Sequence, residues 1–127
     1  MNLTGRQVGR DIVPTLLGSL KKDKSSKGDG CVIHITEVGP RDGLQNEKTI
    51  LTTNDKLKFI EQLVKAGAKS IEVASFVNPK IVPQMADAEA VIERLPQADG
   101  VIYKALVLSK SGMARLLNTS IKHAQFS

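Results

Sequence analysis

The alternation of strand-like and helix-like segments is the feature that most constrains the fold of this chain. Runs rich in β-branched and aliphatic residues lie at 31–36, 70–75 and 101–107, and residues 122–127 are expected to begin a fourth strand. The segments between them carry apolar residues at helical spacing, and the connecting loops are short. Alternation of this kind predicts a parallel sheet that is either doubly wound or closed into a barrel.

The helices expected between these strands have recognisable ends. The first is expected to begin at the cluster of N-cap residues 52–55 and to end at Gly67. The second is expected over residues 85–95. The third should carry Met113, Leu116 and Leu117 behind a cap at Ser109 or Ser111. The sequence therefore predicts an α/β fold with about four strands and three helices.

Residues 1–30 are predicted to form a flexible N-terminal extension, and residues 31–127 the folded part. The segment 21–30, KKDKSSKGDG, is polar and glycine-containing, as expected of a linker. Residues 1–22 hold four basic residues and a single acid, Asp11. This composition fits an organelle transit peptide, and a disordered leader fits it at least as well. Mitochondrial and cytoplasmic locations both stay open.

The net charge of +5 does not indicate a nucleic-acid partner, because most of it lies outside the folded part. Residues 1–30 hold six basic residues and three acids, and residues 31–127 hold twelve and ten. No basic stripe is interleaved with aromatic residues. No apolar run approaches the ~20 residues of a membrane span. We therefore expect neither nucleic acid nor membrane as a partner.

An adjacent cation and anion, Arg41 and Asp42, follow the first strand-like run where Gly39 and Pro40 interrupt it. Gly43 is expected to let the chain turn sharply there. Charged residues at the C-terminal end of a strand are the usual place of chemistry in α/β folds. A surface salt bridge at a turn is the alternative. No G-x-G-x-x-G or Walker loop follows the strand, which disfavours nucleotide-binding folds.

Two blocks, EVGPRDGLQNE at 37–47 and IEVASFVNPK with VPQM at 71–80 and 82–85, resemble the 3-hydroxy-3-methylglutaryl-CoA (HMG-CoA) lyase family of metal-dependent lyases. The RDG-x-Q core is shared with isopropylmalate and homocitrate synthases, whereas the second block favours the lyase branch. The resemblance implies the first half of a (β/α)₈ TIM barrel, which typically needs about 250 residues. It also implies cleavage of an acyl-CoA substrate, HMG-CoA, into acetyl-CoA and acetoacetate, as in leucine degradation and ketone-body formation.

The same resemblance implies roles for individual residues. Asp42 is expected to bind a divalent cation, Mg²⁺ or Mn²⁺. Arg41 is expected to contact substrate and stabilise oxyanion charge. Glu72, placed by alternation on the face opposite Ile71 and Val73, is expected near the C-terminal end of the second strand. It would transfer a proton, serve as a structural partner of Arg41, or do both.

Other residues of the two blocks are expected to support the site or contact the substrate. Glu37 should support the site, and Gln45 should orient the Arg41–Asp42 pair and contact the substrate. The other candidates for substrate contact are Lys48 (toward a CoA phosphate), Ser75, Asn78 and Lys80. For Gln45, Lys48 and Lys80, a solvent-exposed side chain is the alternative. His34 and His123 are expected to be structural.

The family completes its metal site with a His-x-His pair and an asparagine, and these are absent from the 127 residues. We therefore expect a partial lyase chain without activity of its own. Two open sheet edges should then favour a homo-oligomer or association with a complementary half-barrel. A non-catalytic half-barrel that binds a full-length subunit, or a related acetyl-CoA-dependent synthase, is the alternative.

Overall fold

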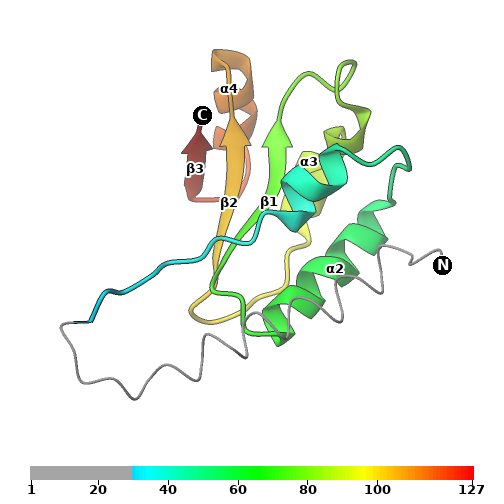
Figure 1. Ribbon diagram of the computed structural model, residues 1–127. Coiled ribbons are helices and arrows are strands. Elements are labelled where there is room, and N and C mark those ends of the chain that lie inside the picture. The colour runs from blue at the N-terminus through cyan, green and yellow to red at the C-terminus, as the bar shows by residue number, and fades with distance from the viewer. Residues whose placement is uncertain (1–29) are drawn as a thin grey trace.

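The computed structural model describes residues 30–127, so the predicted flexible extension lies outside the described residues except for Gly30. Along the chain the elements are η1 (Gly39–Gly43), α2 (Thr53–Lys65), β1 (Ser70–Phe76), η2 (Pro83–Met85), α3 (Ala88–Glu93), β2 (Ile102–Val107), α4 (Lys110–Leu117) and β3 (His123–Phe126) (Figure 1). The element η1 is a π-helical turn, and η2 is a short 3₁₀-helix.

The three strands form a parallel sheet in the order β1–β2–β3. The predicted α/β fold with a parallel sheet is therefore confirmed. β1 is buried along its length apart from its first residue, Ser70. Its pairing with β2 shifts by one residue between Glu72 and Ala74, so Val73 has no partner in the ladder. Alternation along β1 is thus interrupted directly after Glu72.

Only one residue near the expected first strand pairs with the sheet. Glu37 forms an isolated parallel bridge with Ile71. In this register Thr36 lies opposite Ser70, the first residue of β1. Residues 31–35 therefore extend beyond the first residue of β1. No strand of the described chain lies beside them, and they are exposed. The expected strand over 31–36 is wrong, and the described sheet has three strands rather than about four.

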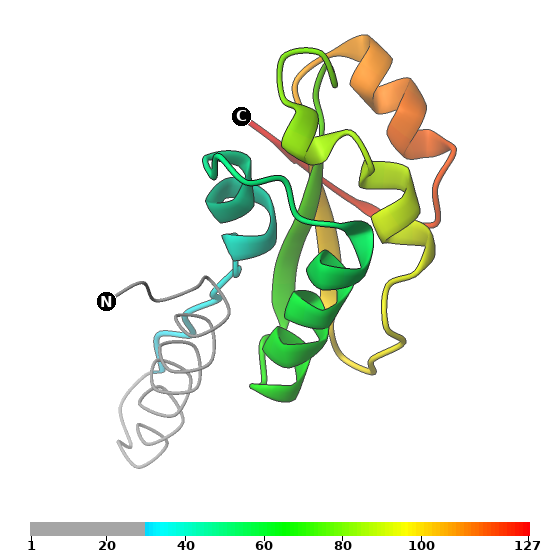
Figure 2. The ribbon, with the colours of Figure 1, turned by 90° about the vertical axis from the view of Figure 1, so that its right-hand side faces the viewer.

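The core lies between the sheet and the apolar faces of the helices. Figure 2 shows α2 and α3 on one side of the sheet and η1 on the other. Residues Leu57, Ile60 and Leu63 form the buried stripe of α2, as their spacing predicts. This helix begins and ends where the sequence predicts. Its N-cap, Thr52, accepts a hydrogen bond from the Asp55 amide at 3.2 Å. After its last turn, Gly67 adopts a φ of 99°, a conformation that favours glycine.

The helix expected over 85–95 is divided into η2 and the shorter α3. Asp87, between them, has a non-helical conformation and directs its carboxylate sideways to Lys56 and Thr53. At the other end, α3 stops before Leu95, because a residue that precedes a proline, here Pro96, is disfavoured in a helix.

α4 lies against the C-terminal end of β1. Its N-cap is Ser109, as predicted, but Leu117 is 73% exposed and does not join the core. A Cβ atom at Gly112 would lie 2.5 Å from the carbonyl oxygen of Phe76, so a larger residue would push α4 away. No helix within residues 30–127 has the length and apolar character needed to cross a membrane.

An ion pair joins α4 to α3. The Arg115 side chain donates Nε and Nη2 to the two carboxylate oxygens of Glu89, at 2.6 and 2.9 Å. The same guanidinium donates Nη1 to the Val77 carbonyl at 3.1 Å and lies 5.3 Å above the Phe76 ring. The hydrogen bonds from Arg115 lower the pKa of the Glu89 carboxyl and, in return, raise the pKa of Arg115.

Candidate active site

The centre of the site is an ion pair between η1 and β1. Arg41 donates Nε to Oε1 of Glu72 at 2.5 Å, and the two side chains are 17% and 4% exposed. Glu72 lies opposite Lys104 in the β1–β2 register, and its backbone neighbour Ile71 belongs to the core. The Glu72 side chain therefore lies on the face of the sheet opposite the helices. It is the third of the seven residues of β1, not near the C-terminal end as expected.

The turn η1 presents Arg41 to this face. Its backbone wraps around one carbonyl, because the amides of Arg41 and Asp42 both donate to the Val38 oxygen, at 3.1 and 2.7 Å. A Cβ atom at Gly39 would lie 2.9 Å from the Glu37 carboxylate and 3.2 Å from the Phe59 ring, so a larger residue would displace the Glu37 side chain. The reason expected for Gly43 is wrong, since its φ is not positive and a Cβ there would meet no atom within 4 Å.

Glu37 supports this turn from the sheet, as expected. Its amide donates to the Ser70 carbonyl and its carbonyl accepts from the Glu72 amide, both at 2.8 Å. Its carboxylate accepts from the Gly39 amide at 2.7 Å. Glu37 is thereby fixed to β1 on both sides of Ile71, and its carboxylate holds Gly39, the first residue of η1.

Asp42, the expected metal ligand, is the exposed member of the site. Its Oδ1 accepts from Nη1 of Arg41 at 2.9 Å, and its side chain is 54% exposed. Its carbonyl accepts from the Asn46 side chain at 2.8 Å. Within residues 30–127, no group of three or more His, Cys, Asp or Glu side chains lies close enough to bind a metal ion. Asp42 therefore fits a divalent cation as a single carboxylate ligand and not as part of a complete protein site.

The structure brings two of the expected substrate-contact residues together. The Ser75 hydroxyl, fully buried, donates to the side-chain oxygen of Gln45 at 3.3 Å. Gln45 is thus directed toward β1, and no hydrogen bond to the Arg41–Asp42 pair is found for its side chain within the described chain. Ser75 lies opposite Leu106 in the register, three positions along β1 from Glu72.

The remaining substrate-contact candidates lie on exposed loops. Lys48 follows η1 and is exposed. Asn78 and Lys80 lie between β1 and η2, where the Asn78 side chain accepts from the Lys80 amide at 3.0 Å and stabilises a turn. All three are outside the Arg41–Glu72 contact.

One residue that sequence reasoning left out, Lys104, lies beside the pair. Lys104 is the register partner of both Glu72 and His123, so the three side chains form a row across the sheet. The Lys104 ammonium donates to the Thr36 hydroxyl at 3.3 Å. Alternation in the run 101–107 was the available signal, because it places Lys104 on the face opposite Tyr103. His123, expected to be structural, is exposed in this row.

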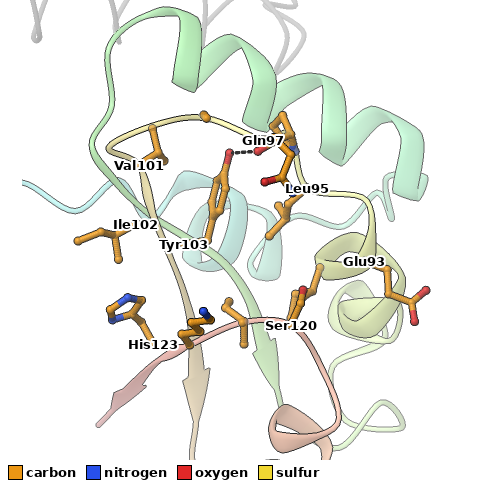
Figure 3. Close-up of a pocket in the computed structure, with 13 residues that line it drawn as sticks. Glu93, Leu95, Gln97, Val101, Ile102, Tyr103, Ser120 and His123 are labelled. Atoms are coloured by element: carbon orange, nitrogen blue, oxygen red, sulfur yellow. Dashed lines mark hydrogen bonds between the residues drawn. The ribbon is translucent and has the colours of Figure 1, made fainter.

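A cavity of about 410 Å³ lies elsewhere, at the N-terminal ends of β2 and β3 (Figure 3). Its lining includes Ile102, Tyr103 and His123 but none of the residues of the Arg41–Glu72 pair. The Tyr103 hydroxyl donates to the Pro96 carbonyl at 2.8 Å, and burial raises its pKa. The cavity is therefore separate from the Arg41–Glu72 pair.

The site thus combines a buried arginine–carboxylate pair and an exposed aspartate beside a parallel sheet. The family model described as HMGL-like matches residues 32–125. The chain belongs to the HMGL-like family, which includes carbon–carbon lyases. The family resemblance seen in the sequence is thereby confirmed.

Two curated relatives illustrate this similarity. The mitochondrial hydroxymethylglutaryl-CoA lyase of Arabidopsis thaliana is 42% identical over 100 residues, which are 79% of this chain and 21% of the relative. The cytoplasmic 3-hydroxy-3-methylglutaryl-CoA lyase of Rattus norvegicus is 51% identical over 81 residues, 64% of this chain and 24% of the relative. The chain thus spans about a fifth to a quarter of these two proteins.

Solved structures of HMG-CoA lyases are also similar to this chain. The hydroxymethylglutaryl-CoA lyase of Pseudomonas aeruginosa matches with a TM-score of 0.69 and 44% identity over 72% of this chain and 30% of that one. An HMG-CoA lyase of Acinetobacter baumannii, solved in complex with coenzyme A and 3-methylmalate, matches with a TM-score of 0.69 and 35% identity over the same shares. The described fold matches the first part of the TIM barrel in HMG-CoA lyase structures.

Proposed function

We propose that this chain carries the arginine–carboxylate part of an HMG-CoA lyase active site, which cleaves HMG-CoA to acetyl-CoA and acetoacetate. One observation carries the proposal: the buried Arg41–Glu72 ion pair lies directly beside the exposed carboxylate of Asp42. The names of the relatives support the substrate, because they are HMG-CoA lyases. Residues 31–127 would form the first half of a TIM-barrel lyase domain.

Arg41 is the residue to which we assign stabilisation of oxyanion charge. A guanidinium stays protonated at every working pH and has five N–H donors in a fixed plane. Two of its groups are engaged, Nε with Glu72 and Nη1 with Asp42. These contacts fix the plane, so the remaining donors would meet a substrate oxygen without reorganisation. Retro-Claisen cleavage develops negative charge on such an oxygen.

Glu72 has two compatible roles in this proposal. Its contact with Arg41 orients the guanidinium and neutralises a carboxylate that would be costly to bury alone. As a carboxylate it is also a proton acceptor within reach of the same substrate. The hydrogen bond from Arg41 supports the orienting role directly.

A divalent cation is part of the proposal, since the family is generally metal-dependent. Bound Mg²⁺ or Mn²⁺ would polarise a substrate oxygen. Asp42 is the residue of this chain that would hold it, because its exposed carboxylate is a hard oxygen ligand. The side chains of residues 30–127 supply no further set of ligands.

An acyl-CoA is the substrate class that we propose, supported by the related structure solved with coenzyme A. Gln45 and Ser75 would contact the acyl part, because the register places Ser75 on the face of Glu72 and Gln45 accepts from its hydroxyl. Lys48 and Asn78, on exposed loops, are the proposed contacts of the CoA part, with Lys48 meeting a phosphate. The location would be mitochondrial or cytoplasmic, as in the two curated relatives.

Self-association is proposed as well, because β3 has no neighbour on its outer edge within the described sheet. Sedimentation over a dilution series should show dimers or larger species at high concentration. A monomer at every concentration would contradict this.

A segment exchange tests the function. Residues 32–125 would replace the matching segment of the P. aeruginosa lyase, to which this chain is 44% identical. We expect the chimera to release acetoacetate from HMG-CoA in a metal-dependent reaction. A chimera that folds like the parent and binds coenzyme A but does not cleave HMG-CoA would overturn the proposal.

A further inference from the structure

A buried lysine of α2, outside the candidate active site, donates hydrogen bonds to the segment 84–87. Lys56, on α2, is 3% exposed, and a buried ammonium is costly unless its donors are satisfied. Its Nζ donates to Oδ1 of Asp87 and to the main-chain oxygen of Gln84, both at 2.5 Å. The second oxygen of Asp87 accepts from the Thr53 hydroxyl at 2.6 Å. The backbone of Gln84 is therefore fixed to the first turn of α2.

The Gln84 side chain joins these contacts to the segment that follows η1 in the candidate active site. Its Nε2 donates to the main-chain oxygen of Glu47 at 2.8 Å, a contact between residues 37 positions apart. Glu47 closes the turn that follows η1, because its amide donates to the Leu44 carbonyl at 3.2 Å. Gln84, in η2, thus binds the end of the segment 44–47.

The same segment is coupled to the ion pair. The Asn46 side chain donates to the Asp42 carbonyl at 2.8 Å, and the Asp42 carboxylate accepts from Arg41 at 2.9 Å. A path of hydrogen bonds, joined by covalent links within Gln84, between Glu47 and Asn46 and within Asp42, therefore leads from the buried Lys56 to Arg41. Glu37 holds the first residue of η1, and this path holds the segment behind it.

We propose that Gln84, held by the buried Lys56–Asp87 pair, is a positioning residue that keeps Arg41 on Glu72. The lyase role of that pair rests on the proposed function, but the positioning itself does not. Loss of the Gln84 side-chain donor frees the turn after η1, and Arg41 then leaves Glu72 more often. Lys56 acts through Gln84 and touches no substrate.

Arginine modification tests this on the 127-residue chain, without turnover. Phenylglyoxal reacts with accessible guanidinium groups, and mass spectrometry separates Arg41 from Arg94 and Arg115. Gln84→Met keeps the length of the side chain and removes its donor, and Gln62→Met is the matched control at an exposed glutamine of α2. Lys56→Met is a second variant that should act in the same direction.

We expect Gln84→Met to raise the rate of Arg41 modification about fivefold, the effect of losing one ordinary hydrogen bond. The rates at Arg94 and Arg115 should stay unchanged, and Gln62→Met should alter none of the three. An unchanged Arg41 rate in Gln84→Met would overturn the proposal. Equal acceleration at Arg41 and Arg115 would also overturn it, because it would show general loosening of the fold.

Discussion

Arg41 and Glu72 are 31 positions apart in the sequence, yet Nε and Oε1 of their side chains lie 2.5 Å apart on the face of the sheet opposite the helices. The Glu72 side chain is only 4% exposed. Removing one partner of such a pair leaves the other charge buried without compensation. The contact therefore joins η1 to β1 and determines where the Arg41 guanidinium lies.

Arg41→Met should lower the free energy of unfolding by about 3 kcal/mol, because the Glu72 carboxylate then lacks its cation. Arg94→Met, at an exposed arginine, should change it by no more than about 0.5 kcal/mol. In a double-mutant cycle with Glu72→Gln, the two changes should be coupled by about 2 kcal/mol. Urea denaturation measures all of these values. Additive effects would show that the two side chains do not interact.

Gly112→Ala should lower the free energy of unfolding by about 2 kcal/mol, since the new methyl group would lie 2.5 Å from the Phe76 carbonyl oxygen. Gly43→Ala is the matched control, because its methyl group would meet no atom within 4 Å. Thermal unfolding of both variants tests this. A Gly112→Ala protein as stable as the control would mean that α4 does not approach β1 so closely.

The contact between Glu89 and Arg115 predicts a pH dependence of stability. The pKa of Glu89 is lower in the folded protein than in the unfolded chain, because Arg115 donates to its carboxylate. The contact therefore stabilises the fold at pH values above the ordinary glutamate pKa of about 4.3. The stabilisation is lost as the pH falls through the folded-state pKa.

Glu89→Gln should consequently destabilise the protein near neutral pH and lose this effect in acid. Glu61→Gln, at an exposed glutamate of α2, is the control. Denaturation across a pH series would show the difference. The same destabilisation by Glu89→Gln at every pH would contradict an ion pair with Arg115.

The 127-residue chain by itself should release no acetoacetate from HMG-CoA. Asp42 is a single exposed carboxylate, and no cluster of three metal-binding side chains occurs within residues 30–127. A single carboxylate binds Mg²⁺ or Mn²⁺ weakly. An assay with either cation tests this. Acetoacetate formation that Asp42→Ala abolishes would contradict it.

The elements that local signals determine were predictable from the sequence. α2 begins at Thr52 and is followed by Gly67 at its C-terminal end, because cap residues and apolar spacing act within a few residues of chain. The family resemblance and the alternation expected in residues 70–75 predicted that Arg41 and Glu72 lie close together. The parallel order of the sheet follows from strands that alternate with helices.

The remaining features depend on contacts between distant segments. Residues 31–35 have the composition of a strand, but the register of Glu37 with Ile71 leaves them without a partner. Asp87, where the expected second helix is interrupted, binds a buried lysine on α2. The place of Lys104 beside Glu72 depends on the register between two strands. Local composition does not specify any of these.

The most direct test of the catalytic role of Arg41 is the turnover of the lyase chimera with Arg41→Gln. We expect kcat to fall at least about 100-fold, because a preorganised donor to an oxyanion acts mainly in the transition state. KM should change by less than about threefold, and Arg94→Gln should leave both constants unchanged. An Arg41→Gln chimera with the parent kcat and a raised KM would contradict the account and make Arg41 a substrate-binding residue only.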